Sequence, residues 1–420
     1  MNERRLVIVG AGVVGLCCAH YAQKAGWQVT LLDRGGSDRN GCSYGNAGMV
    51  VPSHVVPLAA PGMLGLGLRM MFNRRSPFSI KPRISGELID WARKFMKAAT
   101  ANHVKNAAPL LRDLNIASRT AYQELEEEFG PVFGFTQRGL IMLCKTEPML
   151  EEECKTAELA RSLGIPAEVM DPKALAVLDP GITMDVCGGI YFPRDCHLTP
   201  NRFVAALTES FKRTGGRLIL GAEVTNWRTA GARISAVATS TAEYEADEFV
   251  LSSGAWSTDL ATKLGLRIPM QAGKGYSITL NNAKQLPEIC SILMEARVAV
   301  TPMGATLRFG GTMEIAGLDE SISRERVRGI IESIPAYFPA FSVADFDNKP
   351  VWSGLRPCSP DGIPYIGRFP HFDNLVCATG HAMMGLSLAP VTGKIVADLL
   401  NGDSPEYDMQ MLSPARYQPA

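Results

Sequence analysis

The chain has 420 residues, too many for one small core, so we expect two domains that could be interleaved. It carries 42 lysines and arginines against 42 aspartates and glutamates, a balance that disfavours binding to nucleic acid. Its ten cysteines form no C-x-x-C pair and no pattern of metal-ligand spacing. We therefore predict reduced thiols, no metal site and a cytoplasmic location.

The first forty residues have the order of a strand, a helix and a second strand. The apolar run 6–9 predicts the first strand, 13–25 has a helical pattern ended by Gly26, and 27–32 predicts the second strand. Because the first strand begins so early, we expect no signal peptide. This order is typical of a βαβ unit that binds a dinucleotide.

Between the first strand and the helix, three glycines follow the pattern G-x-G-x-x-G at Gly10, Gly12 and Gly15. Gly10 permits a tight turn, and Gly12 lets the backbone approach a pyrophosphate at the helix N-terminus. Gly15 lets helix and strand pack closely. Asp33, at the end of the second strand, is placed to accept hydrogen bonds from ribose hydroxyls. The motif predicts a dinucleotide site and leaves NAD and FAD equally open.

A glycine-rich stretch, 34–49, follows the second strand and is poor as helix or strand. It predicts a loop that a planar or phosphorylated ligand can approach closely. The apolar stretch 58–72 comes next, but Pro61, Arg69 and three glycines interrupt it, and it is too short to span a membrane. We interpret it as a buried irregular segment, while a peripheral membrane contact stays open because basic residues follow.

The middle of the chain alternates predicted helices and strands. Helical periodicity covers 85–129 and 147–163, with short strands predicted at 139–143 and 188–193. Thr199 is expected to cap a helix that runs to about residue 214.

Three later strands are predicted at 217–220, near 250 and near 376, and the last is followed by a helix at 389–400. They suit a parallel sheet whose carboxyl ends face one ligand. We therefore predict an α/β (α+β) fold, in which a discontinuous Rossmann-like domain contains an inserted antiparallel-sheet domain for the substrate. The predicted segments are 1–57, 196–258 and 350–405 for the nucleotide domain, 58–195 and 259–349 for the substrate domain, and 406–420 for a C-terminal tail.

A stretch dense in proline and glycine, 352–367, holds Arg356 between Gly354 and Pro357. A guanidinium in such a stiff frame suits bidentate capture of a carboxylate. The alternative is a structural arginine that pairs with Asp361 or with another acid.

These motifs together resemble the FAD-dependent D-amino-acid oxidase superfamily. Within it the sequence is most similar to the small subunit of bacterial D-amino-acid dehydrogenases and to the related D-hydroxyproline dehydrogenases. The resemblance spans nearly the full length and implies FAD rather than NAD. The matching stretches are 10–15, 46–48, 57–62, 274–277, 354–357, 360–362 and 379–381 with Gly385.

The resemblance implies a set of FAD contacts. It places 43–49 beside the pyrophosphate and flavin ring, and Val224 at the adenine. It places 380–387 near the ribityl chain and the flavin C2 carbonyl, where a helix N-terminus favours negative charge on the reduced ring. The expected cofactor-binding residues are Gly10, Ala11, Gly12, Val13, Val14, Gly15, Asp33, Arg34, Ser43, Asn46, Ala47, Gly48, Met49, Val224, Ser253, Gly254, Gly380, His381, Met384, Gly385, Leu386 and Ser387.

The resemblance also implies that Arg356 binds the substrate α-carboxylate. Tyr276 is a candidate for a second substrate contact, and His54 is a candidate to face the substrate from the flavin-side loop. For each of these two a packing or surface role is an equal alternative. His381 is expected to orient the backbone near the flavin rather than to act as a base. The sequence departs from the family at Asp33, where the family usually carries glutamate, and at His54, which leaves substrate choice open.

The expected activity is FAD-dependent oxidative deamination of a D-amino acid to the imino or 2-oxo acid. Electrons would pass to a quinone or another non-oxygen acceptor, perhaps with the protein at the inner face of the membrane. The alternatives are a cis-4-hydroxy-D-proline dehydrogenase and an oxygen-using glycine, sarcosine or D-amino-acid oxidase. From a different class, an NAD-dependent dehydrogenase or a non-catalytic nucleotide-binding module also stays open.

Overall fold

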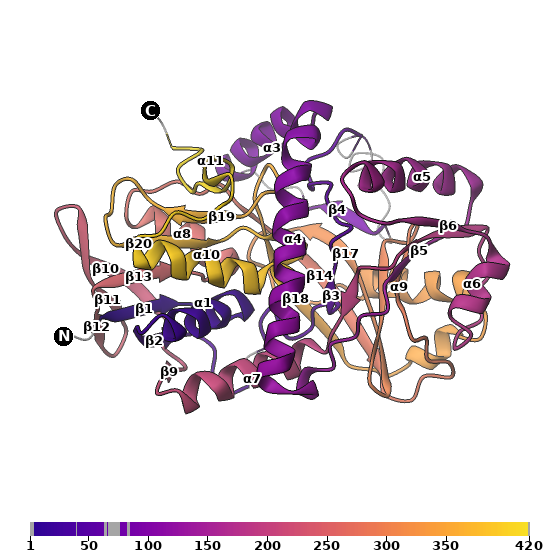
Figure 1. Cartoon of the computed structure of the whole chain (residues 1–420), viewed down its shortest axis with the longest axis horizontal. Coiled ribbons are helices and arrows are strands. Elements are labelled where there is room, and N and C mark those ends of the chain that lie inside the picture. Colours follow the sequence, from indigo (N-terminus) through magenta and orange to yellow (C-terminus); the bar gives the residue numbers. More distant parts are fainter. Residues whose placement is uncertain (1–3, 39, 63–64, 66–75, 82–84, 419–420) are drawn as a thin grey trace.

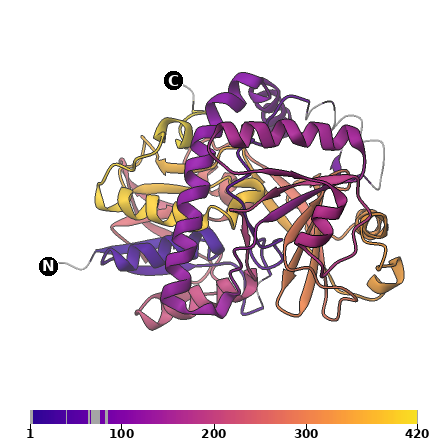
Figure 2. The same cartoon turned by 45° about the vertical axis from the view of Figure 1, so that its right-hand side comes forward.

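The structure is a computed structural model that describes residues 4–38, 40–62, 65, 76–81 and 85–418. Two large sheets organise these residues, each in its own half of the molecule, and a long helix stands between the halves in both views (Figures 1 and 2). That helix is α4 (Ala101–Phe129). The predicted α/β fold class is confirmed.

The first sheet has six strands that come from the beginning, the middle and the end of the chain. Neighbouring strands run parallel, except that the edge strand β19 is antiparallel to β20. Its strands, in order across the sheet, are β19 (Tyr365–Arg368), β20 (Leu375–Thr379), β13 (Glu248–Leu251), β1 (Arg5–Val9), β2 (Gln28–Leu32) and β9 (Arg217–Ile219).

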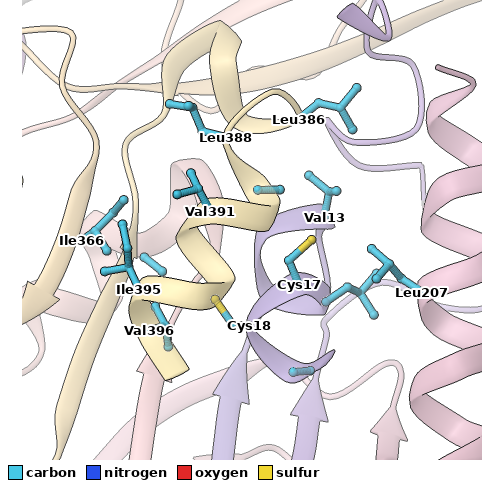
Figure 3. Close-up of a cluster of buried hydrophobic side chains, with 14 of the residues drawn as sticks. Val13, Cys17, Cys18, Leu207, Ile366, Leu386, Leu388, Val391, Ile395 and Val396 are labelled. Atoms are coloured by element: carbon cyan, nitrogen blue, oxygen red, sulfur yellow. The ribbon is translucent and has the colours of Figure 1, made fainter. Parts of the chain in front are cut away.

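Helices α1 (Val13–Lys24), α7 (Pro200–Arg213) and α10 (Ala389–Asn401) cover one face of this sheet and share one apolar core with α4. Figure 3 shows Cys17 and Cys18 of α1 among apolar side chains of α7 and α10. Both cysteines are fully buried, as expected of small packing residues. Thr199 is the N-cap residue of α7, as predicted, although its side chain makes no capping hydrogen bond.

The other face of the first sheet packs against a small antiparallel sheet and the short helix α8 (Ser257–Thr262). Trp227 joins the two, because its ring lies edge-on to Phe249 of the first sheet and its indole N–H donates to the carbonyl of Leu260 at 3.0 Å. The strands of the small sheet are β10 (Val224–Ala230), β11 (Arg233–Thr239) and β12 (Glu243–Glu245).

The second sheet has nine strands. Most neighbours are antiparallel, but β15 pairs with β5, and β17 with β4, in parallel, so the expected antiparallel sheet is mixed. Strand β18 belongs to this second sheet, although we predict the segment 350–405 for the nucleotide domain. The division of the chain into domains stays a prediction. The strands in order are β18 (Val351–Cys358), β14 (Gln271–Leu280), β17 (Thr306–Ile315), β16 (Val298–Met303), β15 (Cys290–Leu293), β5 (Leu140–Cys144), β7 (Gly188–Phe192) and β6 (Glu168–Met170), with β4 (Phe78–Ile80) beside β17.

Further elements surround the two sheets, and none of the helices in the described ranges is long and apolar enough to cross a membrane. Most of the stretch 58–72, predicted to be buried or to touch lipid, lies outside the described residues. The remaining elements are β3 (Met49–Val50), α3 (Gly86–Ala98), η1 (Pro131–Phe133), α5 (Glu147–Ser162), α6 (Pro172–Leu178), β8 (Cys196–His197), η2 (Gly254–Trp256), α9 (Arg324–Tyr337), η3 (Val343–Phe346), η4 (Ala382–Gly385) and α11 (Met409–Leu412).

Candidate functional site

A cavity of about 560 Å³ lies between the two sheets. The last residues of β1 and β2, Val9 and Leu32, line it from the first sheet, and Leu355 and Pro357 of β18 line it from the second. The cavity is thus at the carboxyl ends of parallel strands, where doubly wound sheets bind their ligands.

Fifteen of the expected cofactor-binding residues line this cavity, and seven do not. Trp256 and Glu320 also line it, and our sequence reasoning missed both. Those that line it are Gly10, Ala11, Gly12, Val13, Val14, Asp33, Arg34, Ser43, Asn46, Val224, Ser253, Gly254, His381, Gly385 and Leu386. Those that do not are Gly15, Ala47, Gly48, Met49, Gly380, Met384 and Ser387.

Glycine suits each of the three positions of the motif for a different local reason. Gly10 has φ +107, and a Cβ there would lie 2.5 Å from the carbonyl oxygen of Ser252. A Cβ on Gly15 would lie 1.9 Å from the carbonyl oxygen of Gly10, so close packing of α1 requires glycine there. Among the described residues, a Cβ on Gly12 would meet only the Ser43 hydroxyl within 4 Å, at 3.4 Å. The motif therefore leaves room for a ligand at Gly12, which fits a pyrophosphate beside the helix N-terminus.

Asp33 holds the glycine loop as well as lining the cavity. Its Oδ2 accepts from the backbone N–H of Ala11 and its Oδ1 from that of Gly35, both at 2.7 Å. A carboxylate has further lone pairs, so it can still accept from a ribose hydroxyl, and that contact stays a prediction. Arg34 beside it lies over the ring of Trp256, 3.5 Å from the centroid, and pairs with Glu320 at 3.8 Å.

The segment 386–388 lines the cavity through Leu386, and side chains of α4 hold the carbonyls of Leu386 and Ser387. The Tyr122 hydroxyl donates to the carbonyl of Leu386 at 2.6 Å, and the Ser118 hydroxyl donates to that of Ser387 at 2.5 Å. The Ser387 hydroxyl donates to the Asn115 side-chain oxygen at 2.9 Å. These three α4 residues are fully buried, so each makes its hydrogen bond away from competing water.

His381 is buried at the start of the same region. Its Nε2 lies 3.0 Å from the Thr392 hydroxyl, and desolvation lowers its pKa to about 3. The imidazole is therefore neutral at physiological pH. A neutral ring tied to α10 is compatible with the expected orienting role, which stays a prediction.

Arg356 lies on β18, and its guanidinium covers Gly275, where a Cβ would be 2.1 Å from Nη2. Its Nη1 donates to the carbonyl of Thr312 at 2.7 Å. Thr312 has φ +64, a strained conformation for a β-branched residue, at an irregular point in the pairing of β14 and β17. Within the described ranges Arg356 has no acidic partner.

The alternative in which Arg356 pairs with Asp361 is wrong. Arg416 of the C-terminal tail takes that carboxylate, with Nε 2.8 Å from Oδ2 and Nη2 3.0 Å from Oδ1. The Tyr417 hydroxyl donates to the same carboxylate at 2.9 Å. Arg356 is therefore left for another anion. It does not itself line the cavity, although its neighbours Leu355 and Pro357 do.

The structure does not bring Tyr276 to Arg356. Gly273 lies opposite Arg356 in the pairing of β14 with β18, so side chains of odd-numbered β14 residues share the face of Arg356. Tyr276 faces the other way, into the core under α9, and its hydroxyl donates to Glu314 Oε2 at 2.8 Å. Its suggested contact with substrate finds no support in this geometry.

His54 belongs to a hydrogen-bonded group that sequence reasoning missed. Its Nδ1 lies 3.1 Å from the Ser53 hydroxyl, which donates to Asp195 Oδ2 at 2.5 Å. Burial raises the pKa of Asp195 to about 7 and lowers that of His54 to about 4. His54 does not line the cavity. No local signal links Asp195 to His54, because they are far apart in the sequence and meet only in the fold.

Comparison with known proteins identifies the family. The model of the family described as "FAD dependent oxidoreductase" (DAO) matches residues 5–399. The chain belongs to this family. The D-amino acid dehydrogenase of Granulibacter bethesdensis is 31% identical over 419 residues, which cover 98% of this chain and 99% of the relative. The D-amino acid dehydrogenase of Vibrio atlanticus is 32% identical over 424 residues, with the same coverage.

Solved structures share the fold. Glycine oxidase from Geobacillus kaustophilus superimposes with a TM-score of 0.78 at 23% identity, over 99% of this chain and 100% of that chain. L-proline dehydrogenase from P. horikoshii gives 0.74 at 19% identity, over 99% and 98%. At this identity the likeness carries the fold alone.

The protein is thus an FAD-dependent oxidoreductase, and FAD rather than NAD is its cofactor. The NAD-dependent and non-catalytic alternatives are wrong. The cavity fits this cofactor, because it extends from Asp33 and Val224 past the glycine loop to Asn46 and Leu386. The assignment of individual residues to FAD stays a prediction.

Proposed function

We propose that the protein oxidatively deaminates a D-amino acid to the imino acid, which water hydrolyses to the 2-oxo acid and ammonia. The names of its relatives at 31–32% identity support the substrate class. The observation that carries the proposal is Arg356, a guanidinium beside the cavity with one N–H on Thr312 and no acidic partner among the described residues. A cation in this state suits the α-carboxylate that every amino acid carries.

In the proposed reaction Arg356 orients the substrate. The carbonyl of Thr312 fixes Nη1, and the bare backbone of Gly275 lets the guanidinium lie flat against β14. Bound FAD supplies the two-electron acceptor for the hydride that leaves the substrate Cα. The chain contributes position more than acid–base chemistry, because a substrate held in one orientation needs only a neutral amine to react.

We further propose that the protein is cytoplasmic and that its electron acceptor is a quinone or another non-oxygen molecule. A quinone acceptor would bring the protein to the inner face of the membrane. The dehydrogenase relatives support this choice. A cyclic substrate such as cis-4-hydroxy-D-proline, and an oxygen-using oxidase, are the alternatives, and neither has a specific observation in its favour.

Stopped-flow bleaching of the bound flavin by a panel of D-amino acids, including proline derivatives, tests the substrate class. The expected result is bleaching by D- but not by L-enantiomers, with dye or quinone reduction and no peroxide. Stoichiometric peroxide would contradict the non-oxygen acceptor, and bleaching by none of the panel would contradict the substrate class.

Replacing Arg356 with leucine tests its role. Arg356→Leu should retain its flavin and lose at least about 100-fold in kcat/KM, because a charge-assisted contact to the carboxylate is removed. Arg328→Leu, which removes an exposed arginine that pairs with Glu332, is the matched control and should behave like the wild type. Loss of flavin from Arg356→Leu would mean that the residue is structural.

A further inference from the structure

The loop 40–46 is held to the second sheet through its backbone carbonyl groups. The indole N–H of Trp352 donates to the carbonyl of Asn40 at 3.0 Å, and the Ser277 hydroxyl donates to that of Gly45 at 2.9 Å. Arg308 takes two more of the carbonyls. Each of the three donors comes from a different strand, β18, β14 or β17. The second sheet therefore sets the position of a loop that lines the cavity.

Arg308 donates more hydrogen bonds to this loop than Ser277 or Trp352 does. Its Nη1 donates to the carbonyls of Tyr44 at 3.2 Å and Asn46 at 2.8 Å, and its Nε donates to the Thr279 hydroxyl at 3.0 Å. Both Tyr44 and Asn46 line the cavity. Arg308 therefore contacts residues that themselves border any ligand lying against the loop.

The charge of Arg308 has no counter-charge in the part of the chain that the structure describes. Its hydrogen-bond partners among the described residues are neutral oxygens, and burial lowers its pKa to about 10, so it remains protonated. Burying a cation among neutral partners is costly. Neutral donors such as Ser277 and Trp352 already hold the same loop without that cost, so holding the loop does not by itself account for a charged residue here.

We propose that Arg308 is a positioning residue for the bound FAD, which clamps the loop 44–46 and places beside the cavity a positive charge that favours the negatively charged reduced flavin. The inference rests on the assignment of this cavity to FAD and is independent of the substrate proposed above. The charge would be compensated when the reduced ring is present, because the ring gives the buried cation a counter-charge that the described residues do not supply.

The test separates clamp from charge with three variants of the flavin-loaded enzyme. Arg308→Met removes both, and Arg308→Lys keeps the charge but loses the planar fork that reaches two carbonyls. Ser277→Ala removes one neutral attachment and leaves the charge. Arg328→Met is the control. Reduction potentials are measured by dye equilibration without any amino acid, and flavin dissociation is measured by fluorescence.

Arg308→Met should lose at least tenfold in its preference for reduced over oxidised flavin, which is a drop of about 30 mV for a two-electron couple. Arg308→Lys should keep most of the potential while releasing flavin faster, and Ser277→Ala should release flavin faster at an unchanged potential. An Arg308→Met enzyme with the wild-type potential would overturn the proposal. If Arg308→Met does not fold, an Arg308→Lys enzyme whose potential falls by about 30 mV or more, while that of Ser277→Ala stays at the wild-type value, overturns the proposal.

Substrate bleaching of the wild-type flavin makes the two proposals separable. If no D-amino acid bleaches the flavin but its reduction potential depends on Arg308 as described, the proposed substrate class is removed and this inference is kept. If D-amino acids bleach the flavin but its reduction potential does not depend on Arg308, the proposed substrate class is kept and this inference is removed.

Discussion

Two backbone segments border the cavity, and the protein holds them by different means. Arg308, Ser277 and Trp352 of the second sheet bind the carbonyls of the loop 40–46. Tyr122 and Ser118 of α4 donate to the carbonyls of Leu386 and Ser387 in the segment 386–388. One segment is attached across the two halves and by a charge, whereas the other is attached by neutral groups within one packed core.

The difference has energetic consequences. A neutral hydrogen bond contributes about 1 kcal/mol net to stability, and leaving one buried partner unsatisfied costs about 1–3 kcal/mol. Such a bond is independent of what occupies the cavity. A buried cation without a counter-ion is stabilised by an anionic ligand, so the loop 40–46 should respond to the state of the cofactor and 386–388 should not.

Of the changes to the two cavity segments, Gly45→Ala should have the largest effect. A Cβ at this position would lie 2.0 Å from the ring of Trp352, so either the loop or the indole must move. We expect at least about tenfold weaker flavin retention and a loss of about 1–3 kcal/mol in the free energy of unfolding. The ratio of flavin to protein absorbance and denaturant unfolding measure the two effects.

Gly86→Ala is the matched control, because a Cβ there would meet no atom of the described residues within 4 Å. It should leave flavin retention and stability unchanged. A Gly45→Ala protein that retains flavin as Gly86→Ala does would show that the contact of the loop with Trp352 is not needed.

Tyr122→Phe should have an intermediate effect. It removes the donor to Leu386 and leaves that buried carbonyl without its partner, which should lower the free energy of unfolding by about 1–3 kcal/mol. Tyr191→Phe removes an exposed hydroxyl that also donates to a backbone carbonyl, that of Arg138, and should cost less. Urea denaturation measures both, and equal losses would mean that α4 does not hold the segment as described.

Acidification should act on the 386–388 side through the buried His381, and not through Arg308 on the side of the loop 40–46. The pKa of His381 is about 3 in the folded protein against 6.5 when unfolded, so below pH 6.5 the unfolded state binds more protons. Stability contributed by the neutral ring is complete above that pH and is lost as the pH falls toward 3, by about 1.4 kcal/mol per unit. Arg308, with a pKa of about 10, keeps its charge throughout this range.

Urea unfolding at pH 7, 6 and 5 measures this loss. His381→Gln should reduce the slope of stability against pH by about 1.4 kcal/mol per unit, whereas the buried His197, whose pKa is lowered to about 4, continues to contribute. An unchanged slope in His381→Gln would mean that His381 is not the titrating group.

Most of the fold class and half of the candidate site follow from local sequence. The order of strand, glycine turn and helix around Gly10 and Gly15 depends on neighbours within a few residues, and the structure confirms that order. Arg356 was recognised because glycine and proline flank it in the chain. The prediction of FAD rather than NAD depends on motifs over the whole length of the chain, since the glycine motif serves both cofactors.

What only the tertiary structure decided involves residues distant in sequence. Arg308 and Asn46 are 262 positions apart, and Tyr122 and Leu386 are 264 positions apart. No periodicity within a strand or a helix predicts such contacts, and the face that Tyr276 presents depends on the register of β14 against β18. Local patterns set each element and its turns, whereas the donors that hold the two cavity segments are brought there by the pairing and packing of elements from different parts of the chain.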